Sequence, residues 1–308
     1  MSATGDAIIN GAYGAGWSMV RRLPERPAYA LFERIADVSW ARRGKQVRRL
    51  ESNLHRVVGP TATEAQIRQL SKAAMRSYLR YWCDSFRLPG WSKERIVDSI
   101  IIHDNQVLTD ALERGNGVVV ALPHMGNWDH AGAWASLAHR QVVTVAERLK
   151  PEDVYEKFLA FRRALGMEIL PLTGGDPPFP ILLRRLRAGG LIALLGDRDL
   201  TKHGLPVQFF GAEARFPAGP AALAIQTGAS LLAATLWWED GHNHAYMHLI
   251  DLPQDGDKSA RILAATQLVA DTFAIGIAAH PADWHMLQRL WTDDLADNPA
   301  TPAASDTK

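Results

Sequence analysis

The residue types best suited to catalysis stand just after an apolar stretch, where segment 123–129 reads PHMGNWD. His124 and Asp129 lie five positions apart in this segment. A histidine whose second ring nitrogen is held by a carboxylate stays in one tautomer and can take a proton from a hydroxyl, which is the general-base half of acyl transfer. Such a spacing also arises by chance in a chain with 11 histidines, so the strand-then-helix setting has to support it. We therefore predict that His124 and Asp129 are the catalytic residues, with the aspartate as partner of the imidazole.

The residues between and beside this pair fit a strand that turns into a helix. Gly126 removes a side chain next to His124, which should leave room for a reactant. Asn127 is a suitable N-cap for the helix, and His130 should point elsewhere and have a structural role. The simpler alternative is that His124 stabilises the turn and Asp129 caps the helix.

Further charged residues follow a later β-branched run. Glu147 and Arg148 come directly after it, and Arg162 lies on the next predicted helix. Strand ends in a parallel sheet converge on one crevice, so Glu147 is a candidate binding residue, with a solvated loop acid as the alternative. Arg162 either reaches the site or covers the core with its long stem.

A third charged group, Asp197, Arg198 and Asp199, ends another predicted strand. Two carboxylates around a guanidinium are suited to holding sugar hydroxyls or a phosphate. The same carboxylates would also suit a metal, so a metal-dependent hydrolase is the rival interpretation. Its dinuclear site would use His124, Asp129, Asp197, Asp199 and His203.

The first third of the chain has helical periodicity. Helices are expected at 28–40 and 45–57, and the first of them carries Leu31, Ile35 and Val38 on one apolar face. A long helix should begin at Thr63, with Gln66 as its capping-box partner, and end at the Leu-Pro-Gly break at 88–90.

Beyond residue 91, short β-branched runs alternate with helical stretches. Strands are expected at 100–103, 118–122, 142–146, 168–172, 191–195, 207–210, 231–238 and 245–250. Helices are expected at 105–114, 128–138, 151–165, 178–187, 218–226 and 260–277. This alternation predicts an α/β fold with a mainly parallel central sheet flanked by helices, with a helical N-terminal third.

Composition places this chain among ordinary globular proteins, with 47% hydrophobic and 22% charged residues. A single domain over 1–290 is expected, in which 1–90 form the helical part and 91–290 the α/β catalytic core. Segment 293–308, rich in Asp, Ala, Pro and Thr, reads as a disordered tail. One cysteine excludes an intramolecular disulfide, which favours the cytosol. We expect no secretory signal and no ordinary transmembrane helix, because no apolar run approaches the required length.

Positive charge is concentrated near the N-terminus. Residues 1–100 hold 17 Lys and Arg against 9 Asp and Glu, a net charge of +8 in a chain whose total is +1. Ten of these basic residues lie between positions 21 and 56. Nucleic acid or an anionic membrane would fit such a segment. No recognisable DNA- or RNA-binding module accompanies the charge, so we expect a membrane surface and no nucleic acid as partner.

Four blocks in fixed order resemble a known family. They are PHMGNWD at 123–129, Glu147-Arg148, GDRDL at 196–200, and FFG at 209–211 followed by FPAGPAALA at 216–224. Together they are similar to the bacterial lipid A lauroyl/myristoyl acyltransferases. The helical leader, with NLHRVVGP at 53–60 and AMRSYLRYW at 74–82, resembles the actinobacterial branch that acylates phosphatidylinositol mannosides.

The resemblance implies transfer of a long acyl group, palmitoyl by expectation, from acyl-CoA to a mannose hydroxyl of a phosphatidylinositol mannoside. It implies a peripheral protein at the cytoplasmic face of the plasma membrane, with no cofactor besides acyl-CoA as co-substrate and no bound metal. By the same carry-over, Glu147, Arg162, Asp197 and Arg198 would bind substrate. Another glycolipid, such as a lipid A precursor, is the alternative acceptor.

The predicted mechanism needs no acyl-enzyme. His124 takes the proton of the attacking hydroxyl while Asp129 fixes its tautomer, and the oxygen attacks the thioester directly. A long apolar groove beside the pair is expected for the acyl chain.

Overall fold

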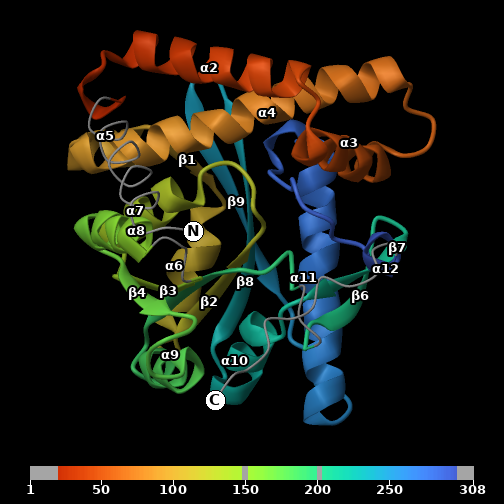
Figure 1. Cartoon of the computed structure of the whole chain (residues 1–308). Helices are drawn as coiled ribbons and strands as arrows, with labels where there is room; N and C mark the ends of the chain where they lie inside the picture. Colours follow the sequence, from red (N-terminus) through yellow and green to blue (C-terminus); the bar gives the residue numbers. More distant parts are fainter. Residues whose placement is uncertain (1–19, 148–151, 200–202, 297–308) are drawn as a thin grey trace.

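The computed structural model describes residues 20–147, 152–199 and 203–296 of the 308-residue chain. Its central sheet consists of β1 (Ile100–His103), β2 (Val118–Leu122), β3 (Val142–Ala146), β4 (Glu168–Pro171), β5 (Leu191–Leu195), β8 (Ser230–Glu239) and β9 (His242–Ile250). The strand order is β1-β9-β8-β2-β5-β3-β4 (Figure 1). Paired strands run parallel except β8 and β9, which form an antiparallel hairpin. The predicted α/β class with a mainly parallel central sheet is confirmed.

Helices cover both faces of this sheet. One face carries α6 (Asn105–Glu113), α7 (Trp128–Ala138) and α8 (Glu152–Ala164), and the other carries α9 (Pro178–Arg187), α10 (Gly219–Thr227) and α11 (Lys258–Ala279). The side chains of β2 alternate between the two cores: Val118 and Val120 belong to the first, Val119 and Ala121 to the second. All five residues of β2 are buried, as expected for a central parallel strand.

The N-terminal third forms a helical layer over the carboxyl ends of β2 and β5 (Figure 1). It consists of α2 (Glu25–Ala41), α3 (Lys45–Val58) and α4 (Glu64–Arg87). The predicted capping box starts α4, because the Thr63 hydroxyl accepts from the Gln66 amide and the Gln66 side chain accepts from the Thr63 amide. α4 lies between α2 and the sheet, so it covers the crevice at the carboxyl ends of the strands.

α2 has two apolar stripes, and the one that the sequence singles out faces outward. Ala28, Phe32 and Ala36 are buried on the inner side of the helix. The outer stripe remains exposed: Leu31 by 40%, Ile35 by 42% and Val38 by 51%. Small side chains on the inner stripe allow α2 and α4 to pack closely, while the larger aliphatic residues have no neighbour among the described residues that buries them.

The remaining elements mostly agree with the predicted pattern. The strand expected at 207–210 belongs to a hairpin that consists of β6 (Leu205–Phe209) and β7 (Ala212–Phe216), and both turn residues, Phe210 and Gly211, have positive φ. A short helix that sequence periodicity does not indicate, α5 (Lys93–Asp98), begins at an N-cap formed by the Ser92 hydroxyl. Six residues are too few for a periodic signal.

Helix α11 has the length and composition of a membrane span, with a mean hydropathy of 1.7 over its most apolar window. Its inner side packs on the sheet and on β6 through Val269, Phe273 and Ile277, which are all buried. A core helix has the same composition, so this feature alone does not indicate a membrane crossing.

The predicted disordered tail is partly helical. Residues 293–296 belong to α12 (Thr292–Ala296), where Arg56 forms an ion pair with Asp294 at 2.9 Å. Residues 297–308 lie outside the described part of the chain.

Candidate active site

His124 lies at the carboxyl end of the central strand β2. The neighbouring strand β5 ends level with it, because Leu122 of β2 is paired in register with Leu195 of β5. His124 and Asp197 each lie two residues beyond that pair. Both side chains therefore leave the sheet edge at the same height, in the crevice where open α/β sheets bind ligands.

The carboxylate partner of the imidazole is Asp197. Nδ1 of His124 is 2.6 Å from Oδ1 of Asp197, and the backbone N–H of His124 donates to Oδ2 at 2.9 Å. An ionised carboxylate only accepts hydrogen bonds, so Nδ1 carries the ring proton and Nε2 presents its lone pair. Asp197 is fully buried, whereas 27% of the His124 side chain is exposed. This is the arrangement of a general base with a fixed tautomer.

Asp197 remains ionised although it is buried. Burial alone would raise its pKa, but the hydrogen bonds and charge of His124 and the Trp284 indole N–H, which donates at 3.0 Å, outweigh burial and hold the pKa below its ordinary value. A carboxylate that stays ionised also stabilises the imidazolium that forms when His124 accepts a proton.

The predicted partnership of His124 with Asp129 is wrong. Nε of Arg162 donates to Oδ1 of Asp129 at 2.7 Å, and the Tyr81 hydroxyl donates to Oδ2 at 2.9 Å. Asp129 is the second residue of α7 and is directed at α8 and α4, so the carboxylate close in sequence serves these neighbours. The carboxylate close in space to His124 comes from the adjacent strand, 73 residues away.

Arg162 and Tyr81 complete a buried clamp around Asp129. Burial would lower the pKa of Arg162, but the charge and hydrogen bonds of Asp129 raise it, so the guanidinium stays charged. Burial raises the pKa of Tyr81 well above its ordinary value, which keeps the phenol protonated and donating. Trp128 stacks on Tyr81 with ring centroids 4.1 Å apart and contacts His124 edge-on at 5.6 Å. The clamp thus positions the aromatic wall beside the histidine.

The prediction that Gly126 makes room for a reactant is wrong. The glycine is required by the backbone conformation of the turn. Its φ is +57°, and a β-carbon would lie 2.7 Å from Cβ of Leu236 on β8. The backbone N–H of Gly126 donates to the Asp283 carbonyl at 2.9 Å. The backbone N–H of His285, two residues further along, donates to the His124 carbonyl at 2.7 Å. The turn after β2 is therefore fixed between β8 and segment 283–285.

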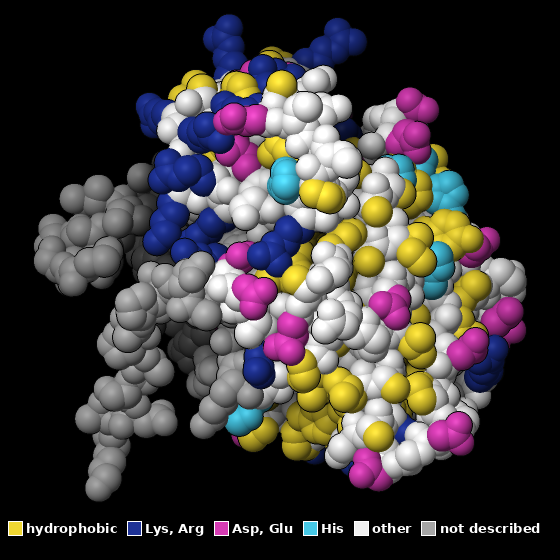
Figure 2. All heavy atoms as spheres, turned by 90° about the vertical axis from the view of Figure 1, so that its right-hand side faces the viewer, with side chains coloured by type: hydrophobic (Ala, Val, Ile, Leu, Met, Phe, Trp, Pro, Cys, Tyr) yellow, Lys and Arg dark blue, Asp and Glu magenta, His cyan; other side chains and the backbone are white. Residues whose placement is uncertain are grey.

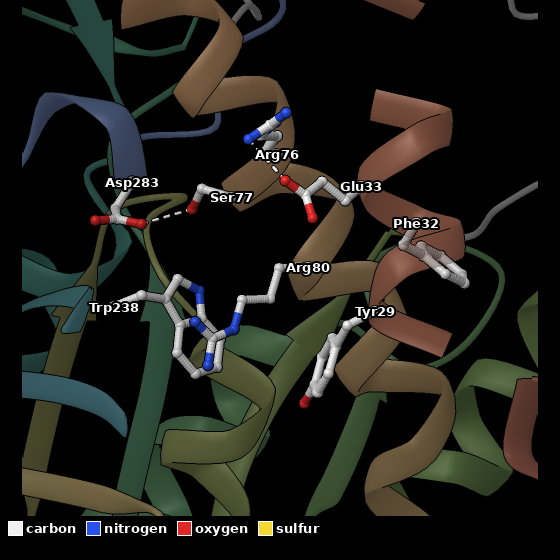
Figure 3. A pocket seen from close by; sticks show the side chains of 8 residues that line it. All are labelled: Tyr29, Phe32, Glu33, Arg76, Ser77, Arg80, Trp238 and Asp283. Atoms are coloured by element: carbon white, nitrogen blue, oxygen red, sulfur yellow. Dashed lines mark hydrogen bonds and ion pairs between the residues drawn. The ribbon is translucent and has the colours of Figure 1, made fainter. Parts of the chain in front are cut away.

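His285 stabilises this turn as a neutral side chain. The Ser77 hydroxyl donates its only proton to Oδ1 of Asp283 at 2.6 Å. Nε2 of His285 lies 3.0 Å from Oγ of Ser77 and is therefore the donor in that hydrogen bond. Burial lowers the pKa of His285 to about 3, which leaves the ring uncharged. Figure 3 shows Ser77 of α4 directed at Asp283, beside Arg80, whose guanidinium lies 3.7 Å above the Trp238 ring.

Two cavities flank these hydrogen-bonded residues. The larger, about 430 Å³, lies between α2, α4 and β8 and contains the side chains drawn in Figure 3. The other, about 350 Å³, contains His124 and is the one in which chemistry can occur. Its apolar lining residues include Val145, Ala146, Tyr155, Leu159 and Leu195. Its polar lining residues include Gln46, Glu147, Arg162, Arg198 and Gln288.

Most of the predicted binding residues reach this cavity. Glu147 is exposed at its edge, Arg162 enters it from α8, and Arg198 lines it and contacts the Gln288 side-chain oxygen. Arg148 lies outside the described residues. The resemblance implies that Asp197 binds the sugar, but Asp197 is not among the residues that line the cavity. Its carboxylate is hydrogen-bonded to His124 instead.

The dinuclear metal set is not assembled in the described part of the chain. Within residues 20–147, 152–199 and 203–296, no group of three or more His, Cys, Asp or Glu is placed to hold a metal ion. The reason is visible at two of the expected ligands, because Asp197 is occupied by His124 and Trp284 and Asp129 by Arg162 and Tyr81.

Trp284, His285 and Ser77 are functional neighbours that no sequence pattern indicates. The first two lie in an irregular segment after α11, and Ser77 lies between Arg76 and Tyr78 in the long helix α4. Asp197 does have a usable signal, because it follows a predicted strand by the same interval as His124 follows its own. Which strands are neighbours cannot be read from that interval.

Comparison with known proteins agrees with this site. The family model of bacterial lipid A biosynthesis acyltransferases matches residues 3–293. The chain belongs to this family. The phosphatidylinositol mannoside acyltransferase of Mycolicibacterium smegmatis is 44% identical over 295 residues, which are 95% of this chain and 94% of that protein. The phosphatidylinositol mannoside acyltransferase of Mycobacterium tuberculosis is 44% identical over 292 residues, 93% of this chain and 90% of that protein.

Family membership makes this chain an acyltransferase and confirms the resemblance drawn from the four sequence blocks. Three of those blocks contribute to the cavity that contains His124: the turn after β2, the residue after β3 and the residues after β5. The fourth block forms the β6–β7 hairpin and the start of α10.

Proposed function

We propose that this protein transfers a long-chain fatty acyl group, of palmitoyl length, from acyl-CoA to a mannose hydroxyl of a phosphatidylinositol mannoside. The observation that carries the proposal is the His124–Asp197 pair beside a cavity lined by both apolar and polar side chains. The relatives that are 44% identical over nearly the whole chain are named phosphatidylinositol mannoside acyltransferases.

The reaction would proceed by direct transfer. The mannose oxygen attacks the thioester carbonyl carbon while its proton moves to Nε2 of His124. The tetrahedral intermediate collapses with cleavage of the C–S bond, and the imidazolium returns the proton to the departing thiolate. Asp197 holds Nδ1–H throughout and stabilises the transient positive charge. Positioned general-base catalysis of this kind contributes about 10² to 10⁴ in rate.

The apolar and polar lining residues of the cavity suit the two substrates. A palmitoyl chain has about 14 methylenes, so full burial would contribute at most ~11 kcal/mol at about 0.8 kcal/mol each. The apolar lining residues, which include Leu159 and Leu195, are suited to the first part of that chain. Glu147, Arg162 and Arg198 supply donors and acceptors for sugar hydroxyls. His124 lines the same cavity.

The test is a product analysis with purified protein. With palmitoyl-CoA and a phosphatidylinositol mannoside, we expect free CoA and a glycolipid heavier by one palmitoyl group, detected by mass spectrometry. Phosphatidylinositol without mannose and a lipid A precursor serve as competing acceptors. The proposed acceptor is wrong if the lipid A precursor is acylated and the mannoside is not. Hydrolysis without transfer would instead indicate a thioesterase.

The outer face of α2 supports peripheral binding to the cytoplasmic face of an anionic membrane. Leu31, Ile35 and Val38 form its exposed apolar stripe, and Arg34 and Arg42 are exposed on the same helix or at its end. Figure 2 shows Lys and Arg side chains gathered over this end of the molecule. An amphipathic surface helix gains from burial of its apolar side at the headgroups, and each nearby basic residue adds about 1 kcal/mol on anionic lipid.

Co-sedimentation with vesicles tests this surface. Binding should be stronger with phosphatidylinositol than with neutral lipid alone, and salt should weaken it. The triple variant Leu31→Ser, Ile35→Ser, Val38→Ser should bind less tightly, whereas Leu263→Ser with Leu268→Ser, exposed on α11, should bind like the wild type. Equal binding of the two variants would rule out α2 as the contact surface.

A further inference from the structure

A second, strongly basic cavity adjoins the catalytic one. It has a volume of about 280 Å³ and lies between the first turns of α3 and the segment that leads into α12. Its lining includes four cationic side chains: Lys45, Arg48, Arg49 and Arg289. Nothing in the proposed chemistry at His124 uses them.

The charges of this cavity are not neutralised within the described part of the chain. Its only acid, Asp294, is already paired with Arg56 at 2.9 Å. Glu51, the only acidic residue of α3, is paired with Arg43 and Arg68 instead. Among the described residues, Lys45, Arg49 and Arg289 have neither a hydrogen-bond nor an ion-pair partner.

The helix end adds to this excess of positive charge. α3 begins at Gly44, which supplies no side-chain cap, and its first turn contains no acid. The free amides and the positive end of the helix dipole therefore coincide with Lys45 and Arg48, an arrangement that is unfavourable by itself. Arg48 donates to the Arg43 carbonyl at 2.8 Å, which holds it at this end. An anion bound here would relieve the repulsion.

The basic cavity and the catalytic cavity are lined by residues that are adjacent in sequence at two places in the chain. Gln46 and Gln288 line the catalytic cavity, and their neighbours Lys45 and Arg289 line the basic one. Nδ2 of Asn53 donates to the carbonyl oxygens of Met286 and Gln288, at 2.7 and 2.8 Å, and so ties α3 to the segment that carries Arg289. A substrate bound at His124 would have to extend past Gln46 or Gln288 to bring a phosphate group to these cations.

We propose that this basic cavity is a phosphate-binding site that holds a phosphate group of a substrate bound at His124. The inference rests on the proposed function, because both of its substrates carry phosphate: CoA has a diphosphate and a 3′-phosphate, and the glycolipid has a phosphodiester. Arginine clusters and free helix amides are the groups that recognise phosphate oxygens. Arg49 and Arg289 are half-buried, so their contacts are less screened than those of surface cations.

Steady-state kinetics of the double variant Arg49→Gln with Arg289→Gln test the site. The Michaelis constant of the substrate whose phosphate is bound should rise about tenfold or more, with kcat retained, since a hydrogen bond between charged groups is lost at each position. Palmitoyl-pantetheine and a simple alkyl mannoside, which lack the respective phosphates, distinguish the sources. The defect should disappear with the analogue of the substrate concerned. The matched control is Arg184→Gln with Arg187→Gln, both exposed on α9.

Direct binding keeps the site testable even if the proposed reaction is wrong. Adenosine 3′,5′-bisphosphate and inositol 1-phosphate are titrated calorimetrically into wild type, the double variant and the α9 control. Binding of either ligand that is lost in the double variant and kept in the control supports the site. Absence of binding to the wild type, or a kinetic defect that persists with both phosphate-free analogues, would overturn it.

Discussion

Two buried aspartates flank the catalytic cavity and are used in different ways. Asp197, after β5, holds the ring of His124 and receives the Trp284 indole N–H. Asp129, on α7, holds the guanidinium of Arg162 and the hydroxyl of Tyr81. One carboxylate is paired with a side chain that can change its protonation state, the other with a permanent cation.

This difference assigns Asp197 a role in the proposed reaction and Asp129 a role in the stability of the cavity. Because imidazole gains and loses a proton in the proposed cycle, the charge of Asp197 counts most in the transition state. Arg162 keeps its charge at every step, so the charge of Asp129 counts equally in all states and contributes mainly to the stability and shape of the cavity. Variants of the two aspartates should therefore fail in different assays.

The largest effect is expected for the pair at the strand ends. His124→Ala and Asp197→Asn should each lower kcat by about 10² to 10⁴ with little change in KM, because a general base or its fixed tautomer is lost. The asparagine can still accept from Trp284, so the fold should persist, as circular dichroism and thermal melting would show. If Asp129→Asn lowered kcat more than Asp197→Asn, our assignment of the histidine partner would be reversed.

The clamp should show the opposite behaviour. Asp129→Ala leaves the guanidinium of Arg162 buried without a counter-charge, which typically costs about 3 to 5 kcal/mol of folding stability. Chemical denaturation measures this loss directly. The double variant Asp129→Leu with Arg162→Met removes both charges and should recover much of the stability. Failure of the second substitution to recover any would show that the ion pair is not what makes Asp129 necessary.

The same two aspartates show how far sequence reasoning extends. Strand and helix positions follow from periodicity, and all five strands expected between residues 100 and 195 appear within one residue of their predicted ends. The proposal that His124 is the reactive residue follows from its place after a buried strand. Its partner does not, because strand order is a property of the folded sheet, and β5 lies beside β2 only after β3 and β4 have been placed further out.

Local spacing was misleading at Gly126 and leaves the buried face of α2 undecided, for a common reason. A periodic apolar stripe such as Leu31, Ile35 and Val38 predicts a helix but not the face that is buried, which is decided by the fit of Ala28 and Ala36 against α4. A glycine beside a catalytic residue indicates space, but the space beside Gly126 is occupied by Leu236. Both the space beside Gly126 and the buried face of α2 depend on contacts between residues that are distant in sequence.

Gly126→Ala tests whether the turn after β2 holds the His124–Asp197 geometry. The positive φ costs an alanine about 1 to 3 kcal/mol, and the overlap with Leu236 adds a similar amount, so a loss of about 2 to 6 kcal/mol is expected. Gly211→Ala, whose φ is also positive but whose β-carbon would meet nothing within 4 Å, isolates the backbone contribution. Activity that falls in the Gly126 variant alone, measured well below its melting temperature, would connect the turn to catalysis. Equal losses of stability in both variants would remove the role of the Leu236 contact.

The smallest effect concerns a third buried aspartate, Asp283, whose pKa moves in the opposite direction from that of Asp197. Burial raises the pKa of Asp283 to about 6, although the Ser77 hydrogen bond and the charge of Arg80 lower it in part. A raised pKa in the folded state means that this group stabilises the fold below its ordinary pKa, near 3.8, and that the contribution is lost as the pH rises through about 6.

Asp283→Asn removes that dependence, so the stability of the variant relative to wild type should increase by up to about 3 kcal/mol between about pH 4 and pH 7. Buried His285, whose pKa is lowered, contributes in the opposite direction, but it is present in both proteins and cancels in the difference. Denaturation at each pH, with exposed Asp255→Asn as control, measures this difference. If the difference in stability between the variant and wild type were constant across this range, Asp283 would be ionised throughout. Asp283 and Asp197 would then differ in their hydrogen-bond partners and not in the direction of their pKa shifts.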